Sequence, residues 1–267
     1  MGKSNWLAEV LLLHNQTVTG QLIVLVSQHM DASNVARRVG LLVPSSDITM
    51  ESELYRNLPE GIELHITRMP LGKVTPEKLA RMAEESEKAL TLIMDVEPHL
   101  IVYGCTSGSF IGGKGYDAKV EERITKLTGV RSITVAHAVV DALKGLGAQT
   151  ISVCTPYSHE INLVEKQFLE ASGFSVKSIH GMNIINDIDI GKLDPEGVYS
   201  FLSQHDDPHA DAMFVSCTNV KTLTIIPRLR SALAKPVVSS NLATLWAICK
   251  QLNGNLDAQI FDDLRTV

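Results

Sequence analysis

The stretch IVYGCTSGSF, from Ile101 to Phe110, places a cysteine and several small hydroxyl residues directly after a short apolar segment. A second stretch, MFVSCTNVKT from Met213 to Thr222, repeats this pattern. A short apolar run before a polar turn is typical of a buried parallel strand, so Cys105 and Cys217 each follow a strand end. A cysteine that only fills space in a core does not need this repeated setting.

The two stretches belong to a longer internal repeat. In each half a proline, Pro44 or Pro156, precedes the cysteine by 61 positions, and Gly61 and Gly173 share the same 112-residue offset. Three landmarks with one spacing indicate two related halves rather than chance similarity.

Between these landmarks, short apolar runs alternate with longer amphipathic ones, a pattern that predicts parallel sheets covered by helices. We therefore predict an α/β fold with two pseudo-symmetric, doubly wound lobes and an active site in the cleft between them. The predicted segments are an N-terminal extension outside the core over residues 1–36, a first lobe over 37–147 with a helix at 241–252 packing back on it, a second lobe over 148–240, and a tail over 253–267.

The composition narrows the function classes. The net charge is −6 and no basic run occurs, which argues against nucleic acid as a partner. The apolar runs near the N-terminus are too short to span a bilayer, so we expect no membrane association. The four cysteines show no CxxC spacing and the nine histidines no HxxxH, so we expect no metal, no cofactor and a cytoplasmic location.

The residues after each cysteine indicate how the thiols could work. Thr106 and Ser107 follow Cys105, and Thr218 and Asn219 follow Cys217. Such residues begin helices or amide nests, whose N–H groups lower a thiol pKa and bind carboxylates. Two thiols facing one cleft could exchange a proton from opposite sides of a carbon, or one could add to a double bond while the other controls protons. The glycine-rich run from Gly108 to Gly115 lacks a phosphate-loop pattern, and we interpret it as a mobile loop over the cleft.

The phrases VPSSDITME, YGCTSGS, TPY and VSCTN resemble those of the aspartate/glutamate racemase superfamily. The chain is most similar to its maleate cis–trans isomerase and arylmalonate decarboxylase branch, which includes ectoine-utilisation proteins, from about Arg37 to about Leu252. The resemblance implies a cofactor-independent, homo-oligomeric isomerase or racemase that acts on a small carboxylate or an amino-acid-like substrate.

The resemblance also assigns residues. Cys105 and Cys217 match the two catalytic cysteines, whereas the decarboxylases keep only the second and have glycine at the first. The presence of Cys105 thus argues against decarboxylation, which stays an alternative beside a non-catalytic ligand-binding protein. The remaining candidates are substrate-binding residues: Ser45, Ser46, Asp47, Thr106, Ser107, Tyr157, Asp187, Thr218 and Asn219.

Two positions depart from the resemblance. Maleate isomerases typically have asparagine where this chain has Asp47, and their later DN pair stands here as Asn186-Asp187. An ionised Asp47 would repel a maleate carboxylate and would suit an ammonium group on the substrate. Alternatively, Asp47 caps a turn and faces away from the site. Both interpretations remain open at this point.

Overall fold

The computed structural model describes residues 36–256 and 259–264. Residues 1–35 of the predicted extension, and 257, 258 and 265–267 of the predicted tail, lie outside the described residues. Everything below concerns the unit that begins at Arg37.

The first half of this unit is a parallel four-stranded sheet with strand order β2-β1-β3-β4. The strands are β1 (Arg37–Pro44), β2 (Ile62–Met69), β3 (Leu100–Tyr103) and β4 (Ser132–Thr134). The helices are α3 (Met50–Asn57), α4 (Pro76–Ile93), α5 (Thr106–Phe110), α6 (Tyr116–Thr128) and α7 (Val135–Gly145), with a 3₁₀ turn at Met94–Val96.

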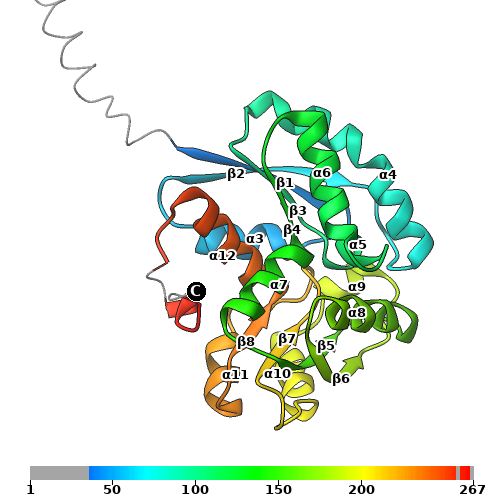
Figure 1. The fold of residues 1–267 in the computed structure, drawn as a ribbon, viewed down its shortest axis with the longest axis vertical. Helices are drawn as coiled ribbons and strands as arrows, with labels where there is room; N and C mark the ends of the chain where they lie inside the picture. Colours follow the sequence, from blue (N-terminus) through cyan, green and yellow to red (C-terminus); the bar gives the residue numbers. More distant parts are fainter. Residues whose placement is uncertain (1–35, 257–258, 265–267) are drawn as a thin grey trace, which may run out of the picture. The chain divides into compact units, whose positions relative to one another are not determined.

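The second half repeats the arrangement, with a parallel sheet of order β6-β5-β7-β8. Its strands are β5 (Thr150–Thr155), β6 (Ser175–Gly181), β7 (Ala212–Val215) and β8 (Val237–Ser239). Its helices are α8 (His159–Ala171), α9 (Asp187–Gly191), α10 (Pro195–Gln204), α11 (Ile226–Leu233) and α12 (Ser240–Leu252), and a 3₁₀ turn follows at Gln259–Phe261. The predicted α/β fold with two parallel sheets is therefore confirmed (Figure 1).

The repeat seen in the sequence is also present in the structure. β3 and β7 have equal lengths and begin 112 residues apart. Gly61 and Gly173 precede the second strand of each half with φ angles of 86° and 105°. Only glycine adopts this left-handed region at low cost, which explains why both halves keep it there.

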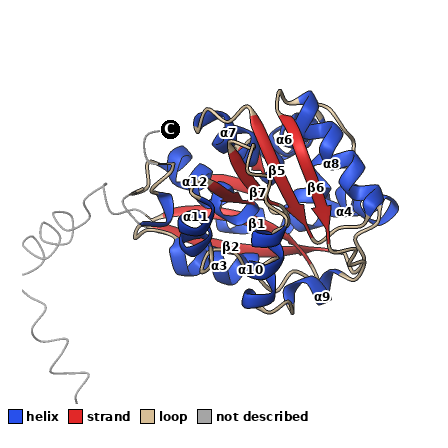
Figure 2. Ribbon diagram, turned by 90° about the horizontal axis from the view of Figure 1, so that it is seen from below, coloured by secondary structure: helices blue, strands red, loops and turns tan. Residues whose placement is uncertain are grey.

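Local sequence signals fix the element ends. Thr75 caps α4, where its hydroxyl oxygen accepts a hydrogen bond from the Lys78 amide, and Pro76 occupies the first turn. Gly129 ends α6 with a φ of 71°. All four residues of β3 and of β7 are buried because helices cover both faces of each sheet (Figure 2).

Two helices bring the halves together. α12, which follows the last strand of the second sheet, packs against α7, α3 and β3 of the first half (Figure 1). α5 of the first half packs in turn against α8 of the second. The predicted boundary between the two lobes at 147/148, and the predicted end of the second lobe at 240/241, remain predictions.

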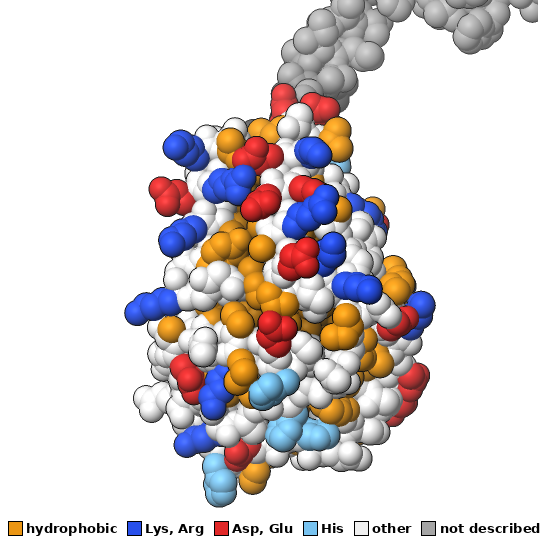
Figure 3. All heavy atoms as spheres, turned by 90° about the vertical axis from the view of Figure 1, so that its right-hand side faces the viewer, with side chains coloured by type: hydrophobic (Ala, Val, Ile, Leu, Met, Phe, Trp, Pro, Cys, Tyr) orange, Lys and Arg blue, Asp and Glu red, His pale blue; other side chains and the backbone are white. Residues whose placement is uncertain are grey.

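The surface over α4 and α6 carries acidic and basic side chains side by side (Figure 3). Arg81 pairs with Glu85 at 2.8 Å within α4, and Arg123 of α6 pairs with Glu87 of α4 at 2.6 Å. None of the described helices combines the length and the apolar character that crossing a bilayer demands.

Candidate active site

Cys105 lies where β3 ends and α5 begins. It is the N-cap of α5 with an ordinary extended φ of −144°. Its Sγ accepts a hydrogen bond from the Gly108 amide at 3.3 Å and lies 3.8 Å from Ser107 Oγ. The predicted mobile loop is wrong at its first residues, because Gly108–Phe110 are buried within α5. The cysteine therefore stands on a fixed helix start.

Cys217 lies at the corresponding end of β7 but has a different backbone. Its φ angle is 95°, in the left-handed range that residues with a side chain rarely adopt. Such strain costs on the order of 1–3 kcal/mol and persists where the surroundings enforce it. The two cysteines share a topological position, yet their backbone conformations differ.

Ser240, the first residue of α12, links the two cysteine sites. Its Oγ accepts a hydrogen bond from the Cys217 amide at 3.1 Å and another from Thr106 Oγ1 at 2.9 Å. Both cysteines are only 4% exposed. The structure thus brings the two predicted catalytic thiols into one buried site, with Thr106 as part of the connection.

Burial dominates the protonation of both thiols. It raises the pKa of Cys105 to about 12, against the lowering effect of the Gly108 hydrogen bond, and the charge of Asp187 raises it further. Burial and then Asp187 also raise the pKa of Cys217, while the Tyr157 hydroxyl and the Asn219 amide lower it. Without a ligand, both thiols therefore carry their protons at neutral pH.

Asp47 lies two residues before Thr49, the N-cap of α3, and binds the first amides of the helix with one carboxylate oxygen. Its Oδ1 accepts hydrogen bonds from the amides of Thr49 at 2.8 Å and Met50 at 2.9 Å. Its Oδ2 is buried and has no hydrogen bond of good geometry, and the Thr218 hydroxyl beside the carboxyl lowers its pKa. Burial raises the pKa of Asp47 to about 6, and the charge of Asp187 adds to the rise.

Asp187, the first residue of α9, is 3% exposed, and its charge acts on Asp47 and on both thiols. Its Oδ2 lies 2.7 Å from Ser46 Oγ, which also lies 2.6 Å from the Leu71 carbonyl oxygen. The single hydroxyl proton of Ser46 cannot serve both acceptors fully. Burial raises the pKa of Asp187, and Ser46 and Asn219 lower it.

Asn219 joins the loops that carry the two acids. Its Nδ2 donates to the Asp187 carbonyl oxygen at 2.7 Å, and its Oδ1 accepts from the Ile48 amide at 3.0 Å. Gly191 packs so closely here that a Cβ atom would lie 2.6 Å from Asn219 Oδ1. The side chain of Asn219 thus holds the backbone on both sides of the site and also acts on the Asp187 carboxyl.

Three further candidates occupy different positions. Tyr157 is buried beside Cys217, and its ring meets Phe110 edge to face at 6.5 Å. Thr218 is buried next to Cys217. Ser45 is exposed, and its hydroxyl exchanges two 3.0 Å hydrogen bonds with the Leu71 backbone, so the structure leaves it at the rim.

A family model described as arylmalonate decarboxylase matches residues 39–263, which is most of the chain. The chain belongs to this family. One relative, the maleate isomerase of Geobacillus stearothermophilus, is 30% identical over 81% of this chain and 92% of its own length. The arylmalonate decarboxylase of Bordetella bronchiseptica is 24% identical over 83% of this chain and 92% of its own.

A solved structure of the family supports the same branch. A cysteine-to-serine variant of Nocardia farcinica maleate cis-trans isomerase, with a covalently bound succinylcysteine intermediate, has a TM-score of 0.80 and 27% identity. The match covers 84% of this chain and 96% of the Nocardia farcinica chain. These findings confirm the predicted isomerase branch of the family, and the decarboxylase is the more distant match.

One buried acid that connects the two halves was not predicted from the sequence of this arylmalonate decarboxylase family member. Glu53 of α3 accepts hydrogen bonds at Oε1 from the amides of Thr222 at 2.7 Å and Leu223 at 2.9 Å. Its Oε2 accepts from Asn241 Nδ2 at 2.8 Å. The run of polar residues where the last strand ends and α12 begins, Ser239 to Asn241, was the available signal for this part of the site.

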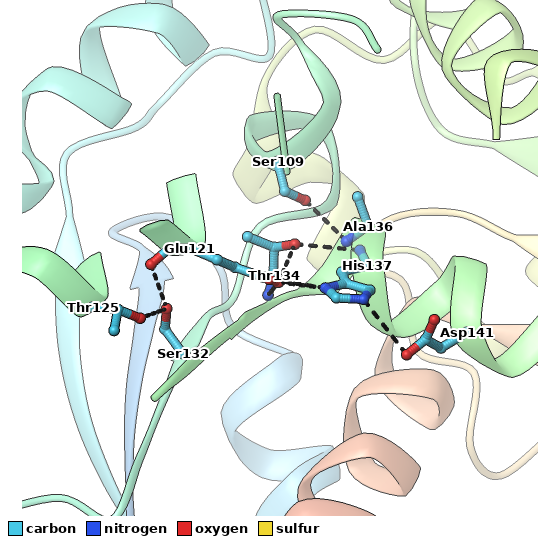
Figure 4. A network of polar contacts seen from close by, with 8 residues as sticks. All are labelled: Ser109, Glu121, Thr125, Ser132, Thr134, Ala136, His137 and Asp141. Carbon is cyan, nitrogen blue, oxygen red and sulfur yellow. Dashed lines mark hydrogen bonds and ion pairs between the residues drawn. The ribbon is translucent and has the colours of Figure 1, made fainter. Parts of the chain in front are cut away.

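A second network holds α5 from behind (Figure 4). Ser109 Oγ lies 2.8 Å from the Cys105 carbonyl oxygen and accepts from the Ala136 amide at 3.1 Å. Glu121 accepts from the Thr134 amide at 2.6 Å and pairs with His137, whose pKa its hydrogen bond raises to about 9. These contacts fix the start of α7 against α5, and so position Cys105.

Proposed function

We propose that the protein is a cofactor-independent isomerase in which Cys105 and Cys217 act as a pair on a small carboxylate. The observation that carries the proposal is that two cysteines from equivalent strand ends share one buried site, because Asp47, Asp187 and Tyr157 act on both thiols. Ser240 connects the surrounding backbone, since its Oγ accepts from the Cys217 amide and from the Thr106 hydroxyl. A protein that only binds a ligand would not need this arrangement. The maleate isomerases among the relatives favour cis–trans isomerisation as the reaction.

The two thiols differ in a way that suggests separate roles. Cys105 stands at a helix start, where the Gly108 amide stabilises a negative sulfur. We assign it as the nucleophile and Cys217 as the acid, with Tyr157 as the neighbouring hydroxyl. The amides that follow each cysteine, at Thr106, Ser107, Thr218 and Asn219, are the proposed carboxylate-binding groups.

In the proposed reaction, the Cys105 thiolate adds to one carbon of a double bond next to a carboxylate. Cys217 gives its proton to the other carbon, which leaves a thioether with a single C–C bond and a Cys217 thiolate. After rotation about that bond, Cys217 takes the proton back, the C–S bond breaks, and the Cys105 thiolate is restored.

The same pair also supports racemisation, in which one thiolate removes an α-proton and the opposite thiol returns one. Incubation in heavy water separates the two modes. Deuterium at the α-carbon of recovered substrate and product indicates racemisation, whereas an isomerised alkene without α-exchange indicates addition and rotation.

The two-thiol proposal is tested by turnover. Maleate and four- and five-carbon amino acids are incubated with the wild type, Cys105→Ser and Cys217→Ser, and products are followed by proton NMR. We expect each serine variant to lose about 10³-fold or more in kcat. Cys154→Ala and Cys249→Ala are the controls, because these cysteines lie in the core away from the site. Intact turnover of every accepted substrate in both serine variants would refute the proposal.

From the resemblance we also propose a cytoplasmic homo-oligomer. Light scattering coupled to size-exclusion chromatography measures the oligomeric state directly.

A further inference from the structure

We infer that the substrate carries an ammonium group as well as a carboxylate, and that Asp47 and Asp187 bind this ammonium group. The inference rests on the proposed function, because it names the substrate class of the same two-thiol site. It places the class among amino acids rather than among dicarboxylates without an amino group.

The capping role of Asp47 decides which atom the ligand meets. Because Oδ1 is held by the Thr49 and Met50 amides, the side chain cannot turn, and Oδ2 keeps its orientation. Oδ2 is buried without a hydrogen-bond partner, which is costly unless a ligand supplies one. An ionised carboxylate oxygen only accepts hydrogen bonds, so the matching ligand group must be a donor.

Asp187 presents a second acceptor with spare capacity. A carboxylate accepts up to about four hydrogen bonds. The structure gives Asp187 Oδ2 the Ser46 hydroxyl at 2.7 Å, whose proton is shared with the Leu71 carbonyl. Asn219 Nδ2 donates to the Asp187 backbone carbonyl oxygen at 2.7 Å, and its side chain also lowers the pKa of the Asp187 carboxyl. A ligand that donates several hydrogen bonds, as an ammonium group does, fits both acids.

The charge balance of the site gives the same answer. Asp187 raises the pKa of Asp47, and the charges of both acids raise the pKa values of Cys105 and Cys217. Arg68 is near, but its guanidinium binds the Asp47 carbonyl oxygen at 2.8 Å and Glu51 at 2.7 Å. An ammonium group would compensate the two carboxylates and favour the thiolate form of either cysteine, whereas a second substrate carboxylate there would be repelled.

The test compares ligands that differ only in the amino group. Aspartate against succinate, glutamate against glutarate, and 2-aminobutyrate against butyrate are titrated into the full-length wild type by calorimetry. Both enantiomers of each amino acid are used at about pH 7.5, where Asp47 is ionised. We expect the amino member of at least one pair to bind about tenfold or more tightly than its partner.

Two isosteric variants identify the residues that produce the preference. In Asp47→Asn, Oδ1 can keep the two capping bonds, so the amide Nδ2 would face the site and offer a donor. We expect this variant and Asp187→Asn to lose the preference by about tenfold, and Asp47→Asn to favour succinate or glutarate instead. Asp189→Asn is the matched control, because it removes one charge from the same helix at a half-exposed side chain paired with Lys192.

The inference is overturned if the member without the amino group binds at least as tightly in every wild-type pair. It is also overturned if Asp47→Asn and Asp187→Asn keep the full wild-type preference for the amino member, since neither acid would then bind the ammonium group. The wild-type comparison needs no variant to fold. It also needs no turnover, so the two proposals fail separately. Turnover that depends on the thiols, without a preference for the amino ligand, refutes this inference alone. A preference for the amino ligand, with turnover that does not depend on the thiols, refutes only the proposed function.

Discussion

The hydroxyl of Thr106 donates a hydrogen bond to Ser240 Oγ at 2.9 Å across 134 positions of sequence. The same Ser240 oxygen accepts the amide of Cys217. One hydroxyl group therefore fixes the distance between the helix that begins after Cys105 and the strained backbone at Cys217. A change at Ser240 should be felt at both thiols together.

Replacing Ser240 with alanine tests this link. The Thr106 hydroxyl and the Cys217 amide would each lose a buried partner, at about 1–3 kcal/mol per group. We expect a lower free energy of unfolding in urea, by about 2 kcal/mol or more, and a fall in kcat larger than the change in KM. Ser231→Ala, which removes an exposed hydroxyl bonded to its own helix, is the control. Unchanged stability and kcat in Ser240→Ala would show that the bridge is dispensable.

The different backbones of the cysteines predict which one forms a covalent adduct. When the accepted substrate is an alkene, Cys217→Ser should accumulate a Cys105 adduct with the added mass of the substrate. Cys105→Ser should accumulate none on Cys217, because Cys217 has a strained left-handed backbone instead of a helix start, and its neighbouring Tyr157 hydroxyl suits an acid. Peptide mass spectrometry after quenching in acid identifies the modified residue. An adduct on Cys217 in the Cys105→Ser variant would reverse the assigned roles.

Removing the charge of Asp187 should make both thiols more acidic. After burial, this charge is the largest influence that raises the pKa of Cys217, and it also raises the pKa of Cys105. In Asp187→Asn, the alkylation of each cysteine by iodoacetamide should therefore reach its half-maximal rate at a lower pH than in the wild type. Peptide-resolved mass spectrometry measures both sites at once. Equal profiles in the two proteins would mean that Asp187 does not act on the thiols.

Glu165 predicts a pH dependence of stability. This residue of α8 is 1% exposed, neither carboxylate oxygen has a hydrogen-bond partner, and burial raises its pKa from 4.5 to about 8. Because the folded state holds the proton more tightly than the unfolded state, Glu165 favours folding most at low pH. That contribution is lost as the pH rises from about 4.5 to about 8.

The variant Glu165→Gln should therefore gain stability relative to the wild type over this pH range. The gain should be on the order of a few kcal/mol above about pH 8 and small near pH 4.5. Urea unfolding at several pH values gives the difference directly. Glu170→Gln, which lies on the exposed side of α8 and pairs with Lys166, provides the reference. A constant difference across the pH range would indicate that Glu165 does not titrate as described.

The repeat in the sequence was sufficient to predict both sheets and the equivalent positions of Cys105 and Cys217. The spacing of Gly61 and Gly173 predicted the turn glycines for a local reason, since a left-handed backbone strongly favours glycine. Long-range hydrogen bonds leave no such local pattern. The roles of Ser240 and Glu53 depend on how two halves meet, which spacing within either half does not encode.

The two oxygens of Asp47 also could not be told apart from the sequence. The sequence offered a capping role and a ligand-facing role as alternatives. The structure shows that capping uses Oδ1 while Oδ2 stays without a partner. Motif comparison assigns one role to one residue, whereas the two oxygens of a carboxylate can differ in their surroundings.

The segment that carries Asp187 is hydrogen-bonded to the opposite half of the protein. The Val74 amide donates to the Ile185 carbonyl oxygen at 2.8 Å, and the Asp187 amide donates to the Gly72 carbonyl oxygen at 3.1 Å. The placement of Asp187 beside Asp47 therefore depends on backbone bonds between segments from different halves. The pair of acids is a property of the assembled molecule, which neither half could form alone.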